Sequence, residues 1–257
     1  PPGQGRFGEK EKTDTATPGK YLHLQLGEDE WSKLRENEDM GKPIHKWLRT
    51  DGWMKKCIKK KSLRDEYHIK THWKIVLIGR PGAGMFNHSD SLLTSSWHAH
   101  VQGDKGKWWY VCGEGMGDGP YKGEKQCFED LVKPGEILFY PKHYFHETQN
   151  LAMPTMTVTG TVVSKFNYHS IATQLHRECA YSHLSFDLSG PLCDELDKCY
   201  PLWHQAFSGI KNKKQAKKEA RRIWPKWRSL ANKKIRRKRD EPESLGNNYD
   251  GRNYINK

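Results

Sequence analysis

The part of the chain that decides the fold begins with Asn87-His88-Ser89-Asp90 and continues to Lys133-Pro134-Gly135-Glu136-Ile137-Leu138-Phe139-Tyr140-Pro141, which leads to His146. Around these two signatures, β-branched and aromatic runs alternate with turns rich in Gly and Pro, a pattern that predicts strands. The expected strands span residues 73–79, 86–90, 96–102, 107–112, 126–132, 136–140, 146–151 and 156–163. Short strands with such turns predict a small closed barrel or a double-sheet jelly roll.

Three side chains in this region have the chemistry of a metal site. His88 and Asp90 are two residues apart, so on a strand their side chains point to the same face. His146 is expected on a separate strand after the Pro-Gly turn. Two histidines and one carboxylate on a rigid sheet form a facial triad, which suits non-haem Fe(II) and leaves coordination positions open.

The same region offers a second metal set. His98-Ala99-His100 is an HxH pair that can join His146, as in ordinary cupins. The first motif of that family has a Gly six residues before the first His and a Glu shortly after the second. Here those positions hold Leu92 and at best Asp104, so we favour the triad.

The motifs resemble those of a known family. His88-x-Asp90, Thr94-Ser95-Ser96-Trp97, Val101-Gln102-Gly103-x-Lys105, Pro134-Gly135-Glu136 and His146 with Asn150-Leu151 are similar to the Jumonji-C (JmjC) domain of Fe(II)- and 2-oxoglutarate-dependent oxygenases. The closest resemblance is to the branch described as bifunctional arginine demethylase and lysyl hydroxylase. It covers residues 73–163 and implies a double-stranded β-helix (cupin, jelly-roll) barrel with flanking helices.

The resemblance also implies which residues hold the cofactors. Iron would bind the catalytic triad of His88, Asp90 and His146, and Lys105 would pair with the distal carboxylate of 2-oxoglutarate. A buried ammonium facing a carboxylate is physically sensible, because either charge alone is costly in a barrel interior. The expected cofactor-binding set is Lys105, Thr159, Asn150 and His98.

Two positions depart from the family pattern. Met85 stands three residues before the first His, where the family often has Thr, and His98 stands where the branch has Asn. If its side chain points inward, His98 contacts the cosubstrate or competes for the metal. Both departures leave the triad intact and affect the substrate side.

The implied reaction uses 2-oxoglutarate and O2 and hydroxylates a C–H bond, most simply on a protein side chain. An N-methyl group hydroxylated at the same site is lost as formaldehyde, so demethylation of N-methyl-lysine or arginine is one alternative. Hydroxylation of a nucleic acid is another. A further alternative is a catalytically silent JmjC-like module that binds nucleic acid.

The flanks predict helices and disordered ends. Residues 1–20 are expected to be disordered, 21–72 to form a helical flank, 164–208 to form C-terminal helices and 209–257 to be a basic extension and polar tail. Helical spacing appears in 28–61, 171–181, 192–207 and 211–222. No apolar run reaches the length of a membrane span.

The positive charge is concentrated near the C-terminus. Residues 211–239 hold 15 Lys and Arg and one acidic residue, a net +14, and the rest of the chain is at −1. A solvated basic helix with a nuclear address in 233–239 is one interpretation. The other is RNA or DNA binding, in which Trp224 and Trp227 stack on bases. The first interpretation predicts a nuclear protein, with the cytoplasm as a second location. The second predicts a protein substrate that is basic or associated with nucleic acid.

The cysteine pattern predicts no disulfide framework. Six cysteines lack CxxC spacing, and a chain of 257 residues does not need covalent staples, so a reducing compartment is favoured. Cys193, Cys199 and His204 are a minor zinc alternative with irregular spacing.

Overall fold

The computed structural model describes residues 21–37, 52–90, 92, 94–103, 106–114, 123–151, 153–181 and 186–231. The predicted disordered ends, the basic cluster at 233–239 and Lys105 lie outside these residues. Across the described ranges, no helix combines the length and apolarity that a membrane crossing requires.

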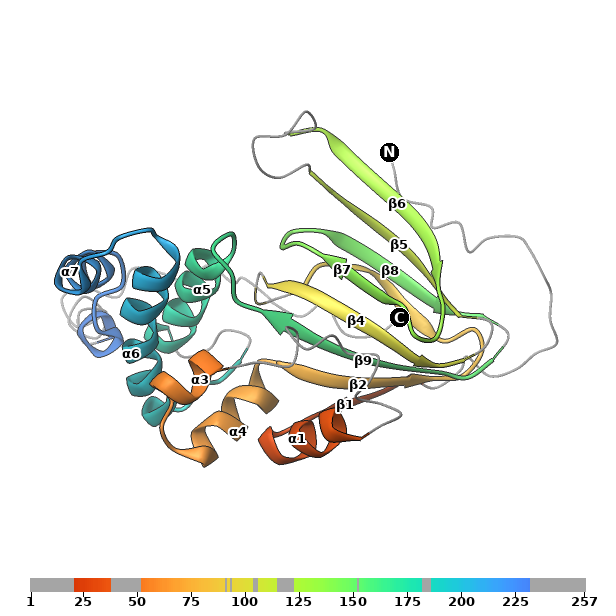
Figure 1. Cartoon of the computed structure of the whole chain (residues 1–257), viewed down its shortest axis with the longest axis horizontal. Coiled ribbons are helices and arrows are strands. Elements are labelled where there is room, and N and C mark those ends of the chain that lie inside the picture. Colours follow the sequence, from red (N-terminus) through yellow and green to blue (C-terminus); the bar gives the residue numbers. More distant parts are fainter. Residues whose placement is uncertain are drawn as a thin grey trace, which may run out of the picture.

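Two antiparallel sheets face each other and form the predicted jelly roll, so the fold is mainly β with flanking helices (Figure 1). The larger sheet has the order β1-β2-β9-β4-β7 and the smaller one β3-β8-β5-β6. The strands are β1 Tyr21–Gln25, β2 Lys74–Gly79, β3 Gly84–His88, β4 Ser95–Gln102, β5 Lys107–Glu114, β6 Lys125–Val132, β7 Ile137–Tyr140, β8 Phe145–Asn150 and β9 Thr155–Val162.

The eight predicted strands are confirmed, with ends that differ by about two residues or less. The sequence did not predict β1, because residues 21–25 fall in the segment expected to be helical. This strand forms at the sheet edge by pairing with β2, where Tyr21 lies opposite Gly79. Its inner side chains therefore face the space between the sheets, which matters for the site.

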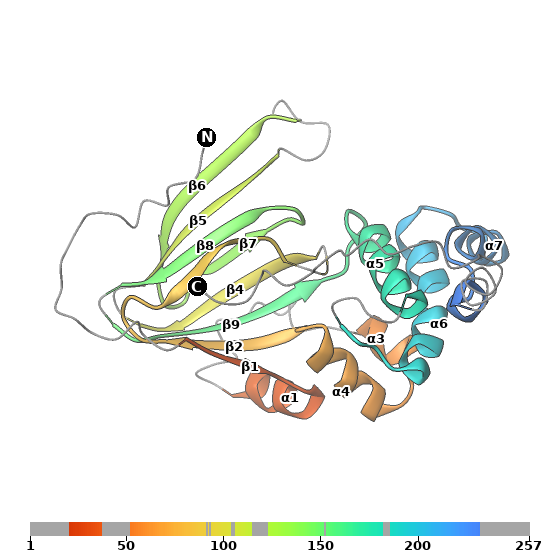
Figure 2. The same cartoon turned by 180° about the vertical axis from the view of Figure 1, so that it is seen from behind.

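The helices gather in two places (Figures 1 and 2). They are α1 Glu28–Glu36, α3 Gly52–Cys57, α4 Lys61–Lys70, α5 Tyr168–Ala180, α6 Gly190–Phe207 and α7 Lys213–Ile223. α1 covers the outer face of the larger sheet, where Trp31 packs with Trp97 and Val158. α3, α5, α6 and α7 form a helical layer at one end of the sheets, with Trp73 and Trp203 in its core.

All six cysteines form disulfides, so the prediction of no disulfide framework is wrong. Cys57–Cys199 joins α3 to α6, Cys179–Cys193 joins α5 to α6, and Cys112–Cys127 links opposite residues of β5 and β6. The zinc alternative is also wrong, since both of its sulfurs are in disulfides. The partners are 14, 15 and 142 residues apart and lie on different elements, so short CxxC-type spacings did not reveal them. Disulfides of this kind favour an oxidising compartment.

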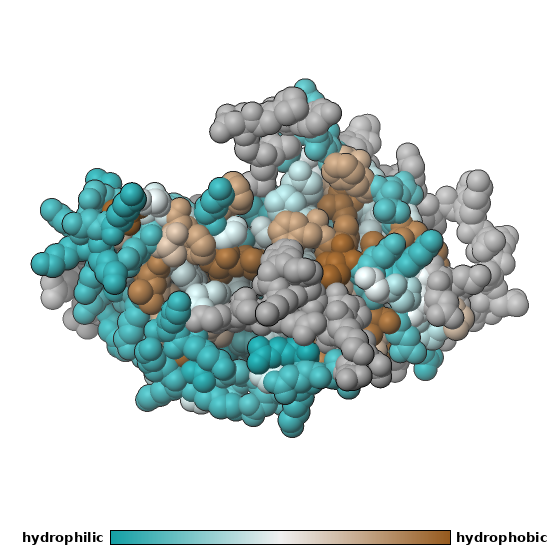
Figure 3. Space-filling view, viewed as in Figure 1, coloured by the Kyte–Doolittle hydropathy of each residue, from teal (hydrophilic) through white to brown (hydrophobic). Residues whose placement is uncertain are grey.

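The described part of the basic extension belongs to the folded body. In α7, Ala216 and Ala220 are fully buried. Trp224, the residue that follows the end of α7, is 1% exposed, and its Nε1 donates to the Thr173 hydroxyl at 3.2 Å. Trp227 donates to Asp194 at 3.0 Å. The prediction that Trp224 stacks on nucleic-acid bases is therefore wrong, because its ring is buried in the core. The outward face of this region is hydrophilic (Figure 3).

Candidate metal centre

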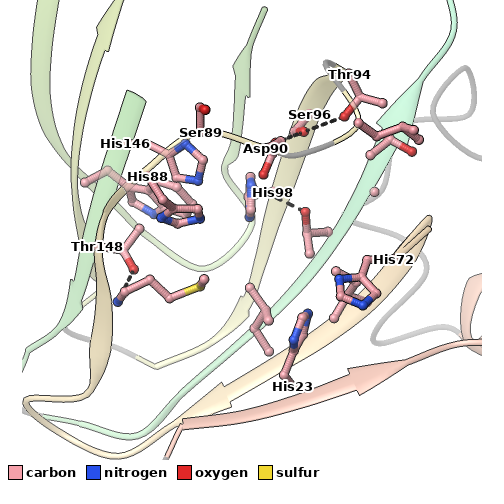
Figure 4. A pocket seen from close by; sticks show the side chains of 18 of the residues that line it. His23, His72, His88, Ser89, Asp90, Thr94, Ser96, His98, His146 and Thr148 are labelled. Atoms are coloured by element: carbon pink, nitrogen blue, oxygen red, sulfur yellow. Dashed lines mark hydrogen bonds between the residues drawn. The ribbon is translucent and has the colours of Figure 1, made fainter. Parts of the chain in front are cut away.

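A cavity of about 290 Å³ lies between the inner faces of the two sheets. Strands alternate their side chains, so the inner residues of β1, β2, β3, β4, β5, β8 and β9 all contribute to its wall. Figure 4 shows His88 and His146 together on one side of the cavity, with Asp90 and His98 near them and His23 and His72 farther away. The charged and titratable lining residues are Tyr21, His23, His72, His88, Asp90, His98, Lys107 and His146.

The three predicted ligands come together in this cavity. One ligand atom from each of His88, Asp90 and His146 lies within 4.8 Å of the others. His88 ends β3 and lies opposite His146 of β8 in the ladder, with ring centroids 4.2 Å apart. Asp90 follows β3 by two residues and completes the group. The three predicted ligands are therefore close enough to bind one metal ion, and the binding of a metal stays a prediction.

The histidines are oriented by backbone carbonyls. Nδ1 of His88 lies 2.7 Å from the Phe86 oxygen, and Nδ1 of His146 lies 3.4 Å from the Tyr144 oxygen. A carbonyl can only accept, so each Nδ1 carries the proton and each Nε2 keeps its lone pair. Hydrogen bonds of this kind hold metal-ligating histidines in the right tautomer. The residues present therefore fit a divalent metal.

Two hydroxyls hold the carboxylate. Ser96 and Tyr140 both donate to Oδ2 of Asp90, the latter at 3.2 Å. Ser96 belongs to the Thr-Ser-x-Trp motif, but nothing in the sequence singled out Tyr140. The strand register carries that signal, because Tyr140 lies opposite Ser96 where β7 pairs with β4.

Electrostatics keep the buried imidazoles neutral. Burial, opposed by the charge of Asp90, lowers the pKa of His146 to about 4. Burial, followed by the neighbouring His146, holds the pKa of His98 well below its ordinary value. Neutral imidazole is the form that binds metals, so the site is ready for a cation at neutral pH.

The rival HxH set is not assembled in the described residues. His98 and His100 both point inward from β4, but Nδ1 of His100 lies 3.2 Å from the Thr157 hydroxyl, outside the cavity lining. His98 does line the cavity, and its Nε2 lies 2.9 Å from the Tyr140 hydroxyl. The ring centroids of His98 and His146 are 6.3 Å apart. His98 therefore points inward, which is the case in which it could contact the cosubstrate or compete for the metal.

A lysine lies in the cavity, two residues after the expected one. Lys105 is outside the described residues, but Lys107 lines the cavity and is 1% exposed. Its ammonium donates to the Tyr21 hydroxyl at 2.8 Å and lies 5.1 Å from the Trp109 ring centroid. Burial lowers the pKa of Lys107 to about 7. Strand alternation could have found it, since Lys107 and Trp109 share the inner face of β5.

The two remaining predicted residues have different surroundings. Thr159 lines the cavity opposite His98, and its hydroxyl donates to the Trp97 carbonyl at 2.8 Å. Asn150 is buried outside the lining, where it donates to the Arg80 carbonyl at 3.3 Å and accepts from the Thr155 hydroxyl. The first bond ties the end of β8 to the turn after β2, and the second ties it to the start of β9. They give Asn150 a structural role, and the described contacts do not direct it to a cofactor.

Comparisons with known proteins find matches among solved structures alone. No family model matches the sequence, and no curated protein matches it. Among solved structures, the Drosophila melanogaster CENP-C cupin domain matches 35% of this chain and 59% of its own, with 8% identity and a TM-score of 0.27. D. melanogaster CENP-C bound to CAL1 matches 35% of this chain and 63% of its own, with 6% identity and a TM-score of 0.27. A recombinant oxalate oxidase in complex with glycolate matches 34% and 39%, with 16% identity and a TM-score of 0.26. The chain spans less than two thirds of each, and similarities this low say nothing of its function.

Proposed function

We propose that this protein is an Fe(II)- and 2-oxoglutarate-dependent dioxygenase that hydroxylates a protein side chain. The observation that supports it best is that one cavity contains both a two-histidine, one-carboxylate group and a buried lysine. A facial triad leaves metal positions open for a chelating cosubstrate. A buried cation nearby is suited to the far carboxylate of a dicarboxylic acid.

In this proposal the triad holds the metal through Nε2 of His88, Nε2 of His146 and the Asp90 carboxylate. Ser96 and Tyr140 fix that carboxylate by donating to it. Bound iron would supply the oxidative chemistry that converts 2-oxoglutarate and O2 to succinate and CO2 while a C–H bond is hydroxylated. The buried sheet walls would exclude bulk water from that chemistry.

Lys107 replaces Lys105 as the proposed carboxylate partner. Its ammonium is buried beside the Tyr21 hydroxyl, and a carboxylate there would receive two donors. A buried ammonium and a buried carboxylate relieve each other's desolvation cost. Thr159 is a cavity-lining hydroxyl on the facing sheet and can contribute once its bond to Trp97 exchanges.

Iron-dependent formation of succinate from 2-oxoglutarate tests the proposal. The purified protein should form succinate with Fe(II), and His88→Ala should abolish it while His100→Ala retains it. Lys107→Met should raise the 2-oxoglutarate concentration for half-maximal turnover roughly ten- to a hundredfold, because a charge-assisted hydrogen bond is worth about 1.5–3 kcal/mol.

The outcomes separate the alternatives. No succinate from folded, iron-loaded protein would leave the silent binding module as the better description. Loss of turnover in His100→Ala but not in His88→Ala would select the HxH set. Mass spectrometry of candidate protein substrates then distinguishes added oxygen from methyl groups lost as formaldehyde.

A further inference from the structure

The phenol oxygen of Tyr140 lies among the candidate metal ligands. It is 3.1 Å from Nε2 of His146, 3.2 Å from Oδ2 of Asp90 and 2.9 Å from Nε2 of His98. Ligands at right angles, each about 2.1 Å from a metal, lie about 3.0 Å apart. The Tyr140 oxygen thus has the spacing of a neighbouring ligand to two members of the triad.

The protons of this cluster support the same conclusion. Thr159 gives its proton to the Trp97 carbonyl, so the Tyr140 and Thr159 oxygens can both accept from Nε2–H of His98. His146 carries its proton on Nδ1, which leaves a lone pair on Nε2. The single Tyr140 proton therefore faces lone pairs on both Asp90 and His146. A cation between the three groups resolves this shortage of protons.

The His98 side chain is placed to hold the phenol. Its ring is nearly parallel to the Tyr140 ring, with an interplanar angle of 22° and centroids 5.5 Å apart. Its Nδ1 is buried without a hydrogen-bond partner among the described residues. Nε2 is thus the nitrogen that makes contacts here, and it contacts Tyr140 at 2.9 Å.

We propose that Tyr140 is a fourth protein ligand of the resting metal centre, positioned by His98, and that 2-oxoglutarate displaces it. This rests on the proposed function. Binding exchanges the phenol proton for the metal and releases it to water, and displacement takes a proton back. In an octahedral site, four protein ligands would leave only two positions. A chelating cosubstrate and O2 together need three, so Tyr140 would have to leave the metal when the cosubstrate binds.

Ferric iron is the probe, because a bound phenolate gives a phenolate-to-iron charge-transfer band in the visible spectrum. We expect the iron-loaded wild type to show this band and to lose it when 2-oxoglutarate is added. Tyr140→Phe should bind the same molar amount of iron without the band. Tyr168→Phe is the matched control, since it removes a buried hydroxyl that contacts His204 at 3.3 Å outside the site. It should keep the band.

Each outcome decides the point. A wild type that binds iron without the band, or a band that survives in Tyr140→Phe, overturns the inference. A band unaffected by 2-oxoglutarate overturns the displacement. Succinate formation without a band would remove the inference and leave the proposed function. A band without succinate formation would support Tyr140 as a ligand and contradict the proposed dioxygenase function.

Discussion

At the scale of single residues, Lys107 is a lysine buried in the cavity, and burying its charge costs stability. Its ammonium is buried next to a hydroxyl and two aromatic rings, those of Tyr21 and Trp109. These contacts stabilise a cation less than water does, which is why the pKa of Lys107 falls from its ordinary 10.5 to about 7. The free-energy cost of burying this ammonium is offset when an anion binds beside it.

The cost predicts a pH dependence of stability. Between pH 7 and 10.5 the unfolded chain binds a proton at Lys107 that the folded chain does not, so this residue makes the free energy of unfolding rise with pH. Below pH 7 both states are protonated and the penalty is complete. Lys107→Met should therefore be more stable than wild type at pH 7, and its advantage should shrink towards pH 10. Urea unfolding at several pH values measures this.

A matched variant controls for the rest of the chain. Lys213→Met removes an exposed lysine of α7 and should show a constant difference from wild type over the same range. An advantage of Lys107→Met that does not change with pH would mean that Lys107 is not buried as a cation in the folded protein.

Sequence predicted the residues whose placement depends on alternation within one strand. His88 and Asp90 were expected on one face for that reason, and both line the cavity, although β3 ends at His88 and Asp90 follows it. Thr159 and His98 were expected near the cofactors from the family resemblance, and both also line the cavity. Tyr140 was missed because its role depends on which strand lies beside it. Tyr21 was missed because its strand was not foreseen.

At the scale of elements, periodicity predicted the strands well and the cross-links poorly. A strand can be read from a few neighbouring residues, whereas a disulfide joins elements that meet only after folding. β1 was as hard to predict as a disulfide, because its five residues form a strand only through pairing with β2, which is distant in sequence. The helices α5 and α6 were predicted to within about three residues at each end.

The disulfides predict a graded loss of stability on removal. Cys112–Cys127 closes a separation of 15 residues and Cys57–Cys199 one of 142 residues. Chain entropy assigns them about 3 and about 5 kcal/mol. Replacing each pair by two serines should therefore cost more stability for Cys57–Cys199, by about 2 kcal/mol. Urea unfolding of the two double variants compares them, and equal losses would contradict the entropic account.

At the scale of the whole molecule, disulfides brace the barrel and the helical layer separately. Two disulfides lie within the helical layer, and the third spans the β5–β6 hairpin. This number of disulfides fits an oxidising compartment better than a reducing one. Nuclear localisation and nucleic-acid binding stay predictions, now without the support of an exposed Trp224.

The buried side of α7 changes what a C-terminal truncation does. An appended basic tail would allow deletion after Ser208 without harm to the fold. Here that deletion removes Ala216, Ala220 and Trp224 from the core, and burial of a tryptophan side chain is worth about 3–5 kcal/mol. We therefore expect the truncated protein to unfold at much lower urea than wild type.

Two variants separate loss of fold from loss of charge. Trp224→Ala should reproduce much of the destabilisation, whereas Lys217→Glu with Lys218→Glu changes only exposed residues of α7 and should unfold like wild type. The charge-reversed protein is therefore the proper test of nucleic-acid binding by this helix, because it keeps the core intact. If binding occurs through this face, its salt dependence should weaken in that variant, since fewer phosphates are neutralised. A truncated protein with wild-type stability would show that α7 does not pack on the body as described.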